Sequence, residues 1–330
     1  MKKILLLVCC FTCPLYIYAQ DSAPDEDQGK ITAKIYSNFK YGMKPGNRST
    51  AFEIERAYFG FERRINKYFS ANVKLDIGSP DDISEYSRLR RYAYFKNAGI
   101  QFRYAKITVN AGLFDMPQFK IQEKFWGYRY LYKSYMDEYK FGPSADIGLS
   151  AQYDFSNWIS ADLTISNGEG YTTPQRDETY KTGAGLTLQP VKNLTFRGYY
   201  AIFMHENPEM VISGFAGYQS KNLRIGAEFI YQKNYRFYSG HNRYGYSIYS
   251  TYVINESWEM FARYDQLYSN ILTGDMIPWN LPEDGSALIS GIQYTPASNI
   301  HITLDYQDWV EYAENGESNN LIYVHFEVVF

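Results

Sequence analysis

Hydrophobic and polar residues alternate along much of the chain, most plainly in its last ten residues, 321–330. The apolar residues occupy the even-numbered positions Ile322, Val324, Phe326, Val328 and Phe330. The mostly polar set occupies the odd-numbered positions Tyr323, His325 and Glu327. Successive side chains of a strand point to opposite faces, so this segment predicts a strand with one apolar face. Because it ends on an aromatic carboxylate, we expect it to close a barrel wall, with Phe330 as the assembly signal. An edge strand of a soluble sandwich fits the same alternation.

The same alternation recurs upstream. It is clearest in the segments 69–77, 159–166 and 300–307. Between such segments lie seven short polar turns of the kind that join β-hairpins, at 64–67, 103–106, 155–157, 190–193, 220–222, 255–257 and 296–299. Seven hairpins give fourteen strands, and the first and last strands bring the number to sixteen. The sequence therefore predicts an all-β fold, a transmembrane antiparallel up-and-down barrel with short periplasmic turns and longer extracellular loops.

One residue breaks the alternation. If Ala98, Ile100 and Phe102 face outward, Lys96 faces outward as well. A charge on the lipid face at the bilayer midplane costs roughly 2–4 kcal/mol. We therefore expect Lys96 to lie near an interface or to follow a β-bulge.

The N-terminus reads as a targeting segment. A basic start at Lys2 and Lys3 precedes an apolar stretch and the small residue Ala19, which predicts a signal peptide over residues 1–20. All three cysteines lie inside it, so the mature chain is predicted to have no disulfide. Residues 21–29 are predicted to be an acidic flexible leader and residues 30–330 the barrel.

Composition narrows the class of protein. Without Lys2 and Lys3 the chain has 31 basic and 36 acidic residues, a balance that argues against nucleic acid as a partner. Beyond residue 20 no apolar run is long enough for a membrane helix. Yet 34 Tyr, 21 Phe and 5 Trp make up 18% of the sequence, as expected for a barrel with aromatic girdles in contact with outer-membrane lipid. A Tyr-rich soluble β-protein is the alternative.

Charges of both signs fall on the inward parity of the predicted strands. The expected pore-lining residues are Arg56, Lys74, Asp76, Asp162, Arg197, Arg224, Glu228, Arg263, Asp265 and Asp305. Opposed rows of charge would orient polar solutes in a water-filled channel. Alternatively, these residues form ion pairs that stiffen the wall.

The longest loop, 118–144, is predicted to fold inward and narrow the channel, because long loops without strands usually have a function. Its expected solute-contacting residues are Lys120, Lys124, Trp126, Arg129, Lys133 and Lys140. Five basic residues against three acidic ones favour anionic solutes weakly. A surface loop packed on its neighbours is the alternative.

Several stretches resemble a known family. The segments 56–62, 122–130 and 138–146, together with Phe330, are similar to the outer-membrane porins of Bacteroides-type bacteria that are grouped with the phosphate-selective porins O and P. The resemblance covers essentially the whole mature chain. It implies a sixteen-stranded barrel, a homotrimer, and passive passage of small solutes. It does not extend to phosphate selectivity, because the inward basic residues here are interleaved with acids.

The sequence thus predicts an outer-membrane porin for passive diffusion of small hydrophilic solutes, with a weak anion preference and no cofactor. An adhesin or a component of a larger surface complex is the alternative. A barrel enzyme would need a nucleophile near one of the four histidines, His205, His241, His301 and His325, and we expect no enzymatic activity. An active transporter would need a plug and about 22 strands.

Overall fold

The computed structural model describes residues 29–43, 50–78, 92–176, 178–312 and 319–330. The predicted signal peptide and leader lie outside the described residues, apart from Gly29. Among the described residues, no helix is long and apolar enough to cross a bilayer.

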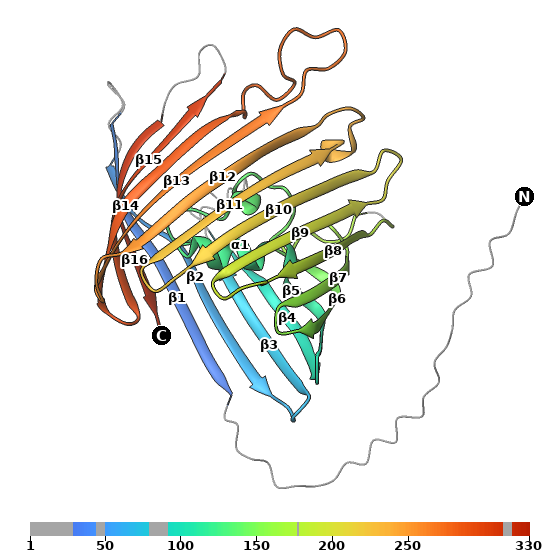
Figure 1. Ribbon diagram of the computed structural model, residues 1–330, viewed down its shortest axis with the longest axis horizontal. Coiled ribbons are helices and arrows are strands. Elements are labelled where there is room, and N and C mark those ends of the chain that lie inside the picture. Colours follow the sequence, from blue (N-terminus) through green and yellow to red (C-terminus); the bar gives the residue numbers. More distant parts are fainter. Residues whose placement is uncertain (1–28, 44–49, 79–91, 177, 313–318) are drawn as a thin grey trace, which may run out of the picture.

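Sixteen antiparallel strands form one closed barrel in sequence order (Figure 1). Their bounds are β1 Lys30–Gly42, β2 Thr50–Arg64, β3 Phe69–Ile77, β4 Ala93–Tyr104, β5 Ile107–Asp115, β6 Ala145–Ser156, β7 Ile159–Ser166, β8 Lys181–Leu188, β9 Leu194–Phe203, β10 Glu209–Gln219, β11 Leu223–Lys233, β12 Arg243–Val253, β13 Trp258–Ser269, β14 Gly285–Ala297, β15 Ile300–Glu311 and β16 Asn319–Val329. The predicted fold and strand number are confirmed, and the seven short turns lie where the sequence places them.

The wall closes where the two ends of the barrel meet. β16 pairs with β1 from Lys34 opposite Val329 to Gly42 opposite Leu321. Beyond the last strand residue, Ala33 and Phe330 exchange two backbone hydrogen bonds of 2.6 and 2.9 Å. The 321–330 segment is therefore the closing strand, as predicted.

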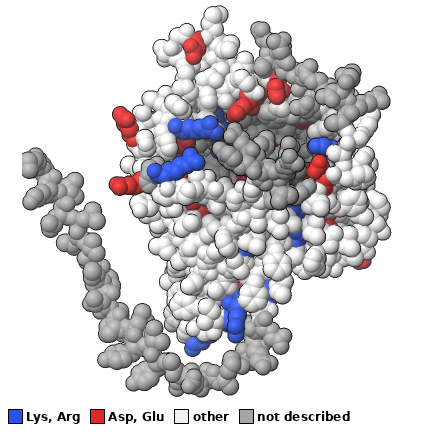
Figure 2. Space-filling model, turned by 180° about the vertical axis from the view of Figure 1, so that it is seen from behind, with Lys and Arg blue, Asp and Glu red and all other residues white. Residues whose placement is uncertain are grey.

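The two faces of the wall meet different surroundings. In β7, Leu163 is 63% exposed, whereas the neighbouring Asp162 is only 7% exposed. A soluble sandwich would bury the apolar set, so the exposed apolar belt identifies a membrane-spanning barrel. On the visible face in Figure 2, charged side chains gather toward the two ends and the band between them is mostly uncharged.

Aromatic side chains mark the end of the barrel that carries the short turns. Tyr153 and Phe155 pack edge to face at 4.8 Å, and Trp258 and Tyr294 lie 4.6 Å apart. Trp158, at the turn between β6 and β7, is 52% exposed. This is the aromatic girdle that the composition predicts at a membrane interface.

Lys96 is accommodated by a β-bulge. Lys74 pairs with Asn97 and Leu75 with Phe95, so Lys96 is the extra residue of β4. The bulge turns its side chain into the barrel, where Lys96 is 5% exposed. Of the two expected explanations, a position near an interface and a β-bulge, the structure shows the β-bulge.

Candidate functional site

The chain between β5 and β6 enters the barrel (Figure 1). It begins with helix α1, Pro117–Trp126, and contains the short helix α2, Tyr135–Glu138. Pro117 occupies the first turn of α1, where no backbone N–H is needed. Gly127 ends the helix in the left-handed conformation, with φ 78°. We call residues 116–144 the inner loop.

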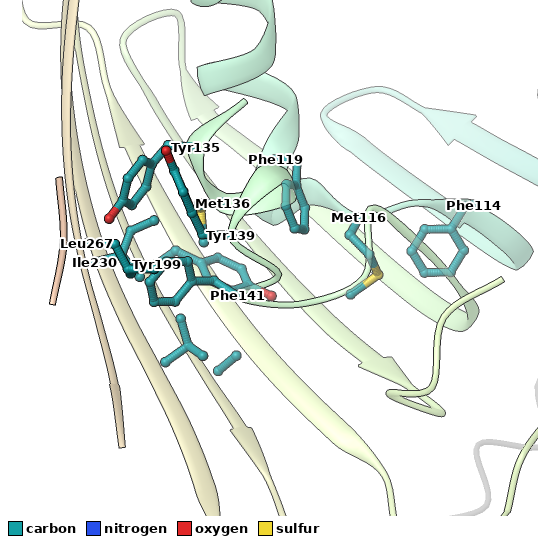
Figure 3. Close-up of a cluster of buried hydrophobic side chains, with 12 residues drawn as sticks. Phe114, Met116, Phe119, Tyr135, Met136, Tyr139, Phe141, Tyr199, Ile230 and Leu267 are labelled. Carbon is teal, nitrogen blue, oxygen red and sulfur yellow. The ribbon is translucent and has the colours of Figure 1, made fainter. Parts of the chain in front are cut away.

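One side of the inner loop is fixed by apolar packing on the wall. Figure 3 shows Tyr135, Met136 and Phe141 of the loop near Ile230 and Leu267 of the wall, with Phe119 farther along the same buried cluster. Tyr135, Met136 and Phe141 are fully buried. The inner loop therefore fills part of the barrel interior instead of leaving it open over its full width.

Arginines of the wall hold the same loop through its backbone. Four arginines on four strands each donate to a loop carbonyl: Arg197 to Pro117 at 3.2 Å, Arg224 to Trp126 at 3.2 Å, Arg263 to Lys133 at 2.7 Å and Arg243 to Lys140 at 2.6 Å. Lys133 and Lys140 lie outside helices and strands, and their carbonyls are paired here by charged donors, which make strong hydrogen bonds. The loop is thus tied to β9, β11, β12 and β13 at four points between residues 117 and 140.

Two of these arginines also form buried ion pairs within the wall. Arg197 donates to both oxygens of Asp162 at 2.6 and 3.0 Å, and Arg263 to both oxygens of Asp265 at 2.8 and 2.7 Å. These four residues are at most 7% exposed. All four side chains face inward, as the alternation predicts. They form ion pairs, which is the alternative given above, and they are covered instead of facing an open channel.

Three further expected pore-lining residues lie beside this covered wall. Glu228 and Asp305 are 4% and 2% exposed, and Asp305 lies 3.0 Å from His325 Nδ1. Arg224 is half-buried against the ring of Tyr128. His301 Nδ1 lies 3.0 Å from Thr295 Oγ1, and His325 Nδ1 lies 3.0 Å from Asp305 Oδ1. Among the described residues, no group of three His, Cys, Asp or Glu side chains could hold a metal ion.

The remaining space lies between the inner loop and the opposite wall. Three cavities share Arg129 as a lining residue. The short-turn cavity, about 330 Å³, is bounded by Lys34, Lys74 and Lys96; the long-loop cavity, about 940 Å³, by Lys140, Lys181 and Arg236. The tyrosine cavity, about 310 Å³, lies beside β1, β2, β15 and β16. The space for solutes therefore converges on Arg129.

Charges of both signs surround this point. On the loop, Arg129 donates to Glu123 at 3.0 Å and also to Asp137. On the wall, Arg56 lies 3.4 Å from Asp76, and Lys74 lies 3.6 Å from Asp115.

Lys96, the bulged residue, hydrogen-bonds Ser144 of the loop. Its ammonium lies 4.3 Å from the centre of the Tyr171 ring. Lys96 thereby links the wall to the end of the inner loop on the side that faces the cavities.

Neighbouring loop carboxyls differ in how readily they bind a proton. Burial alone would raise the pKa of Asp137, but Arg129, aided by Lys133, holds it below its ordinary value. Burial raises the pKa of Glu138 above its ordinary value, although Lys133 and Arg263 oppose the shift. The two positions therefore respond to different pH ranges.

The expected solute-contacting residues separate into two groups. Lys120, Lys124, Lys133 and Lys140 line the cavities, as does Arg129. Trp126, in contrast, is fully buried against Tyr249 and Phe261, with the Arg263 guanidinium 4.8 Å from its ring. Its position leaves no surface for a solute, so the expectation for Trp126 is corrected. Helical spacing of Phe119, Gln122 and Trp126 along one buried face was the signal for packing.

Sequence reasoning missed several cavity residues. These are Lys34, Tyr36 and Lys40 on β1, Tyr58 on β2 and Asp115 at the end of β5. Lys34, Tyr36 and Lys40 share one parity of β1, so the alternation rule applied to β1 would have found them.

No protein-family model matches the chain, and no curated protein sequence matches it. Solved structures do share its fold. OmpF of Salmonella typhi, in complex with daunomycin, aligns with a TM-score of 0.72 and 12% identity over 92% of this chain and 97% of that one. An anion-selective porin from Comamonas acidovorans aligns at 0.64 with 11% identity over 92% and 99%. OmpT of Vibrio cholerae, in a trimer form, aligns at 0.59 with 10% identity over 92% and 99%.

At such identities the likeness concerns the fold alone. It places this barrel among bacterial outer-membrane porins in architecture, in agreement with the exposed apolar belt. It gives no support to the finer resemblance to the phosphate-selective porins O and P.

Proposed function

We propose that this protein is an outer-membrane porin that passes small hydrophilic solutes by passive diffusion and weakly prefers anions. The observation that carries the proposal is the convergence of three cavities on Arg129 inside a closed wall with an apolar exterior. Sixteen strands can enclose an aqueous channel, and the inner loop reduces its width.

Anion preference is supported by the charge of the cavity linings. The short-turn cavity has six basic and three acidic residues among its described lining, and the long-loop cavity has seven and three. A water-filled passage with more fixed positive charge concentrates anions. The inner loop contributes Lys120, Lys124, Lys133 and Lys140 to this excess.

Planar-bilayer recording of the purified protein tests the proposal. We expect ohmic conductance steps. Across a KCl gradient, we expect the reversal potential to shift toward the equilibrium potential of chloride. Replacing Lys120, Lys124, Lys133 and Lys140 by Gln should move the reversal potential toward potassium. The matched control replaces Lys67, Lys192 and Lys221, which lie exposed at short turns, and should leave the potential unchanged. Absence of conductance steps would overturn the channel, and an unmoved potential in the loop variant would overturn the role of the loop.

Two finer assignments belong to the same proposal. Homotrimeric assembly and membership of the phosphate-selective porin group rest on the sequence resemblance. Native mass spectrometry in detergent tests the trimer, and phosphate competition against chloride current tests the selectivity. We expect phosphate to compete no better than sulfate, because acids are interleaved with the inward basic residues.

A second function, attachment to a surface partner, is favoured by one observation. The loop between β13 and β14 extends past the ends of the strands (Figure 1), and it exposes Met276 by 93% and Ile277 by 60%. Exposed apolar side chains away from lipid are typical of interaction sites. Deleting residues 274–278 should then abolish capture of the surface partner and leave conductance intact.

A further inference from the structure

The tyrosine cavity has a lining unlike that of the other two cavities. Five tyrosines surround it, three from the wall and two from the inner loop: Tyr36, Tyr58, Tyr323, Tyr130 and Tyr132. Its volume of about 310 Å³ is at the small end of the range for ligand pockets, about 300–1,000 Å³. A single six-membered ring with its substituents is a ligand of suitable size.

The tyrosine rings meet at steep angles instead of stacking into one layer. Tyr36 and Tyr58 pack edge to face, with centroids 5.7 Å apart and an interplanar angle of 77°. Tyr36 and Tyr130 lie 6.1 Å apart at 50°. Tyr323 stacks on His325 at 4.7 Å, which fixes the direction of its ring. Because the rings are held in different planes, a sugar ring that enters the cavity meets tyrosine faces and edges in more than one direction. The negative face of an aromatic ring attracts weakly positive C–H groups.

The rim of the same cavity is polar and carries both signs. Lys40, Arg56, Arg129 and Lys133 supply donors, and Glu55 and Glu138 supply acceptors. An inorganic anion needs donors only, whereas the hydroxyl groups of a sugar both donate and accept. Arg56 is paired with Asp76, and Arg129 with Glu123 and Asp137. Lys40 and Lys133 are therefore the lining cations that would meet one carboxylate on the ring.

The rim groups are held in place by contacts outside the cavity. Asn38 donates to Glu55 at 2.7 Å, and Arg129 is anchored by Glu123 and Asp137. Gln307 donates to Asp305 at 2.9 Å. Fixed polar groups around the tyrosine rings lower the ordering cost of binding.

We propose that the tyrosine cavity is a binding site for the pyranose ring of a carbohydrate, and best for a sugar acid. This inference rests on the proposed channel function and specifies its solute class. Binding is weak, because a solute must leave the site as readily as it enters for transport to continue.

Four solutes of nearly equal size separate the effect of the ring from that of the charge. Glucose and glucuronate have pyranose rings, whereas sorbitol and gluconate are open chains. Glucuronate and gluconate carry a negative charge, whereas glucose and sorbitol do not. Each is added to a planar bilayer at equal concentration, and the fractional block of the KCl current gives its apparent affinity.

We expect glucuronate to bind about threefold to tenfold better than gluconate, and glucose to exceed sorbitol by a similar ratio, as one or two aromatic contacts would give. Tyr323→Leu should bring both ratios close to one, because Tyr323 lines the tyrosine cavity and neither of the other two. The matched control is Tyr200→Leu, since Tyr200 is 38% exposed on the outer face. It should keep both ratios.

Ring ratios near one in the native channel, or equal loss in both variants, would overturn the site. Such a result would leave the channel itself standing, because conductance steps and the difference between charged and neutral solutes are read in the same recordings. If no conductance is found, saturation-transfer NMR of glucuronate and gluconate on the detergent-solubilised protein tests the binding site independently of the channel. Saturation transfer that favours glucuronate and is lost in Tyr323→Leu supports the site, and equal transfer to both solutes overturns it.

Discussion

Arg263, on β13, joins the wall to the inner loop, because its Nη1 donates to the Lys133 carbonyl at 2.7 Å. Its Nε and Nη2 donate to the two carboxylate oxygens of Asp265. Arg263 is 1% exposed. A loop residue that lines two cavities is thus fixed from the covered side by a charged group of the barrel.

Replacing Arg263 by Met should release the middle of the inner loop. The substitution removes the bond to Lys133 and leaves Asp265 buried without its partner, a change that costs about 3–5 kcal/mol when a buried pair is broken. We expect higher and noisier single-channel conductance with the barrel intact, because Arg263 and Asp265 both lie on β13 and their ion pair joins no two strands. Arg103→Met, at an exposed strand end, is the control. If Arg263→Met has the conductance and current noise of the native channel, Arg263 does not restrain the inner loop.

Arg129→Ala should shift the channel toward cations. Arg129 neutralises Glu123 and Asp137 where the three cavities meet, so its loss leaves two carboxylates facing the passage. One unit charge at 4 Å in water contributes about 1 kcal/mol, or about fivefold in the ratio of chloride to potassium permeability. The reversal potential across a KCl gradient measures this ratio. Lys67→Ala, at a short turn, should leave it unchanged.

The strands could be predicted because their signal is local. Alternation with a period of two defines segments such as 69–77 and 159–166, and polar turns define their pairing, since each strand bonds its neighbours in sequence. Even the misfit of Lys96 was informative, because a charge on the apolar parity is costly enough to require a bulge or an interface.

The sequence could not show which inward residues face the passage. Arg56 and Arg263 share the inward parity, yet Arg56 lines two cavities and Arg263 lies beneath the inner loop. The difference depends on which side of the interior the loop packs against. That choice is made by tertiary contacts such as Phe141 against the wall, and no period along the strands encodes it.

Anion preference should rise as the pH falls from 7 to 5. Burial raises the pKa of Glu138, so protonation begins above its ordinary range and removes a negative charge from the rim of the tyrosine cavity. Asp137 stays charged over this range because Arg129 and Lys133 hold its pKa below the ordinary value. The reversal potential should therefore move toward chloride on acidification.

Glu138→Gln checks the assignment. This variant should already have the more chloride-selective potential at pH 7 and should change less on acidification. Asp137→Asn should shift the potential by a similar amount at both pH values. A pH dependence that is undiminished in Glu138→Gln would assign the titration to another group.

Removal of Phe330 should impair closure of the barrel in the membrane. Its backbone exchanges hydrogen bonds of 2.6 and 2.9 Å with Ala33, each worth about 0.5–1.5 kcal/mol, and they extend the β1–β16 seam by one residue pair. The ring itself is 67% exposed, so its loss creates no cavity inside the barrel. We expect less heat-resistant folded barrel on unheated gels and less protein in the outer membrane, with Phe330→Tyr close to the native level because it keeps both the backbone pair and an aromatic ring. Phe330→Ser keeps the backbone pair and removes the ring, so assembly of this variant distinguishes the seam from the ring as the feature that the membrane insertion step requires.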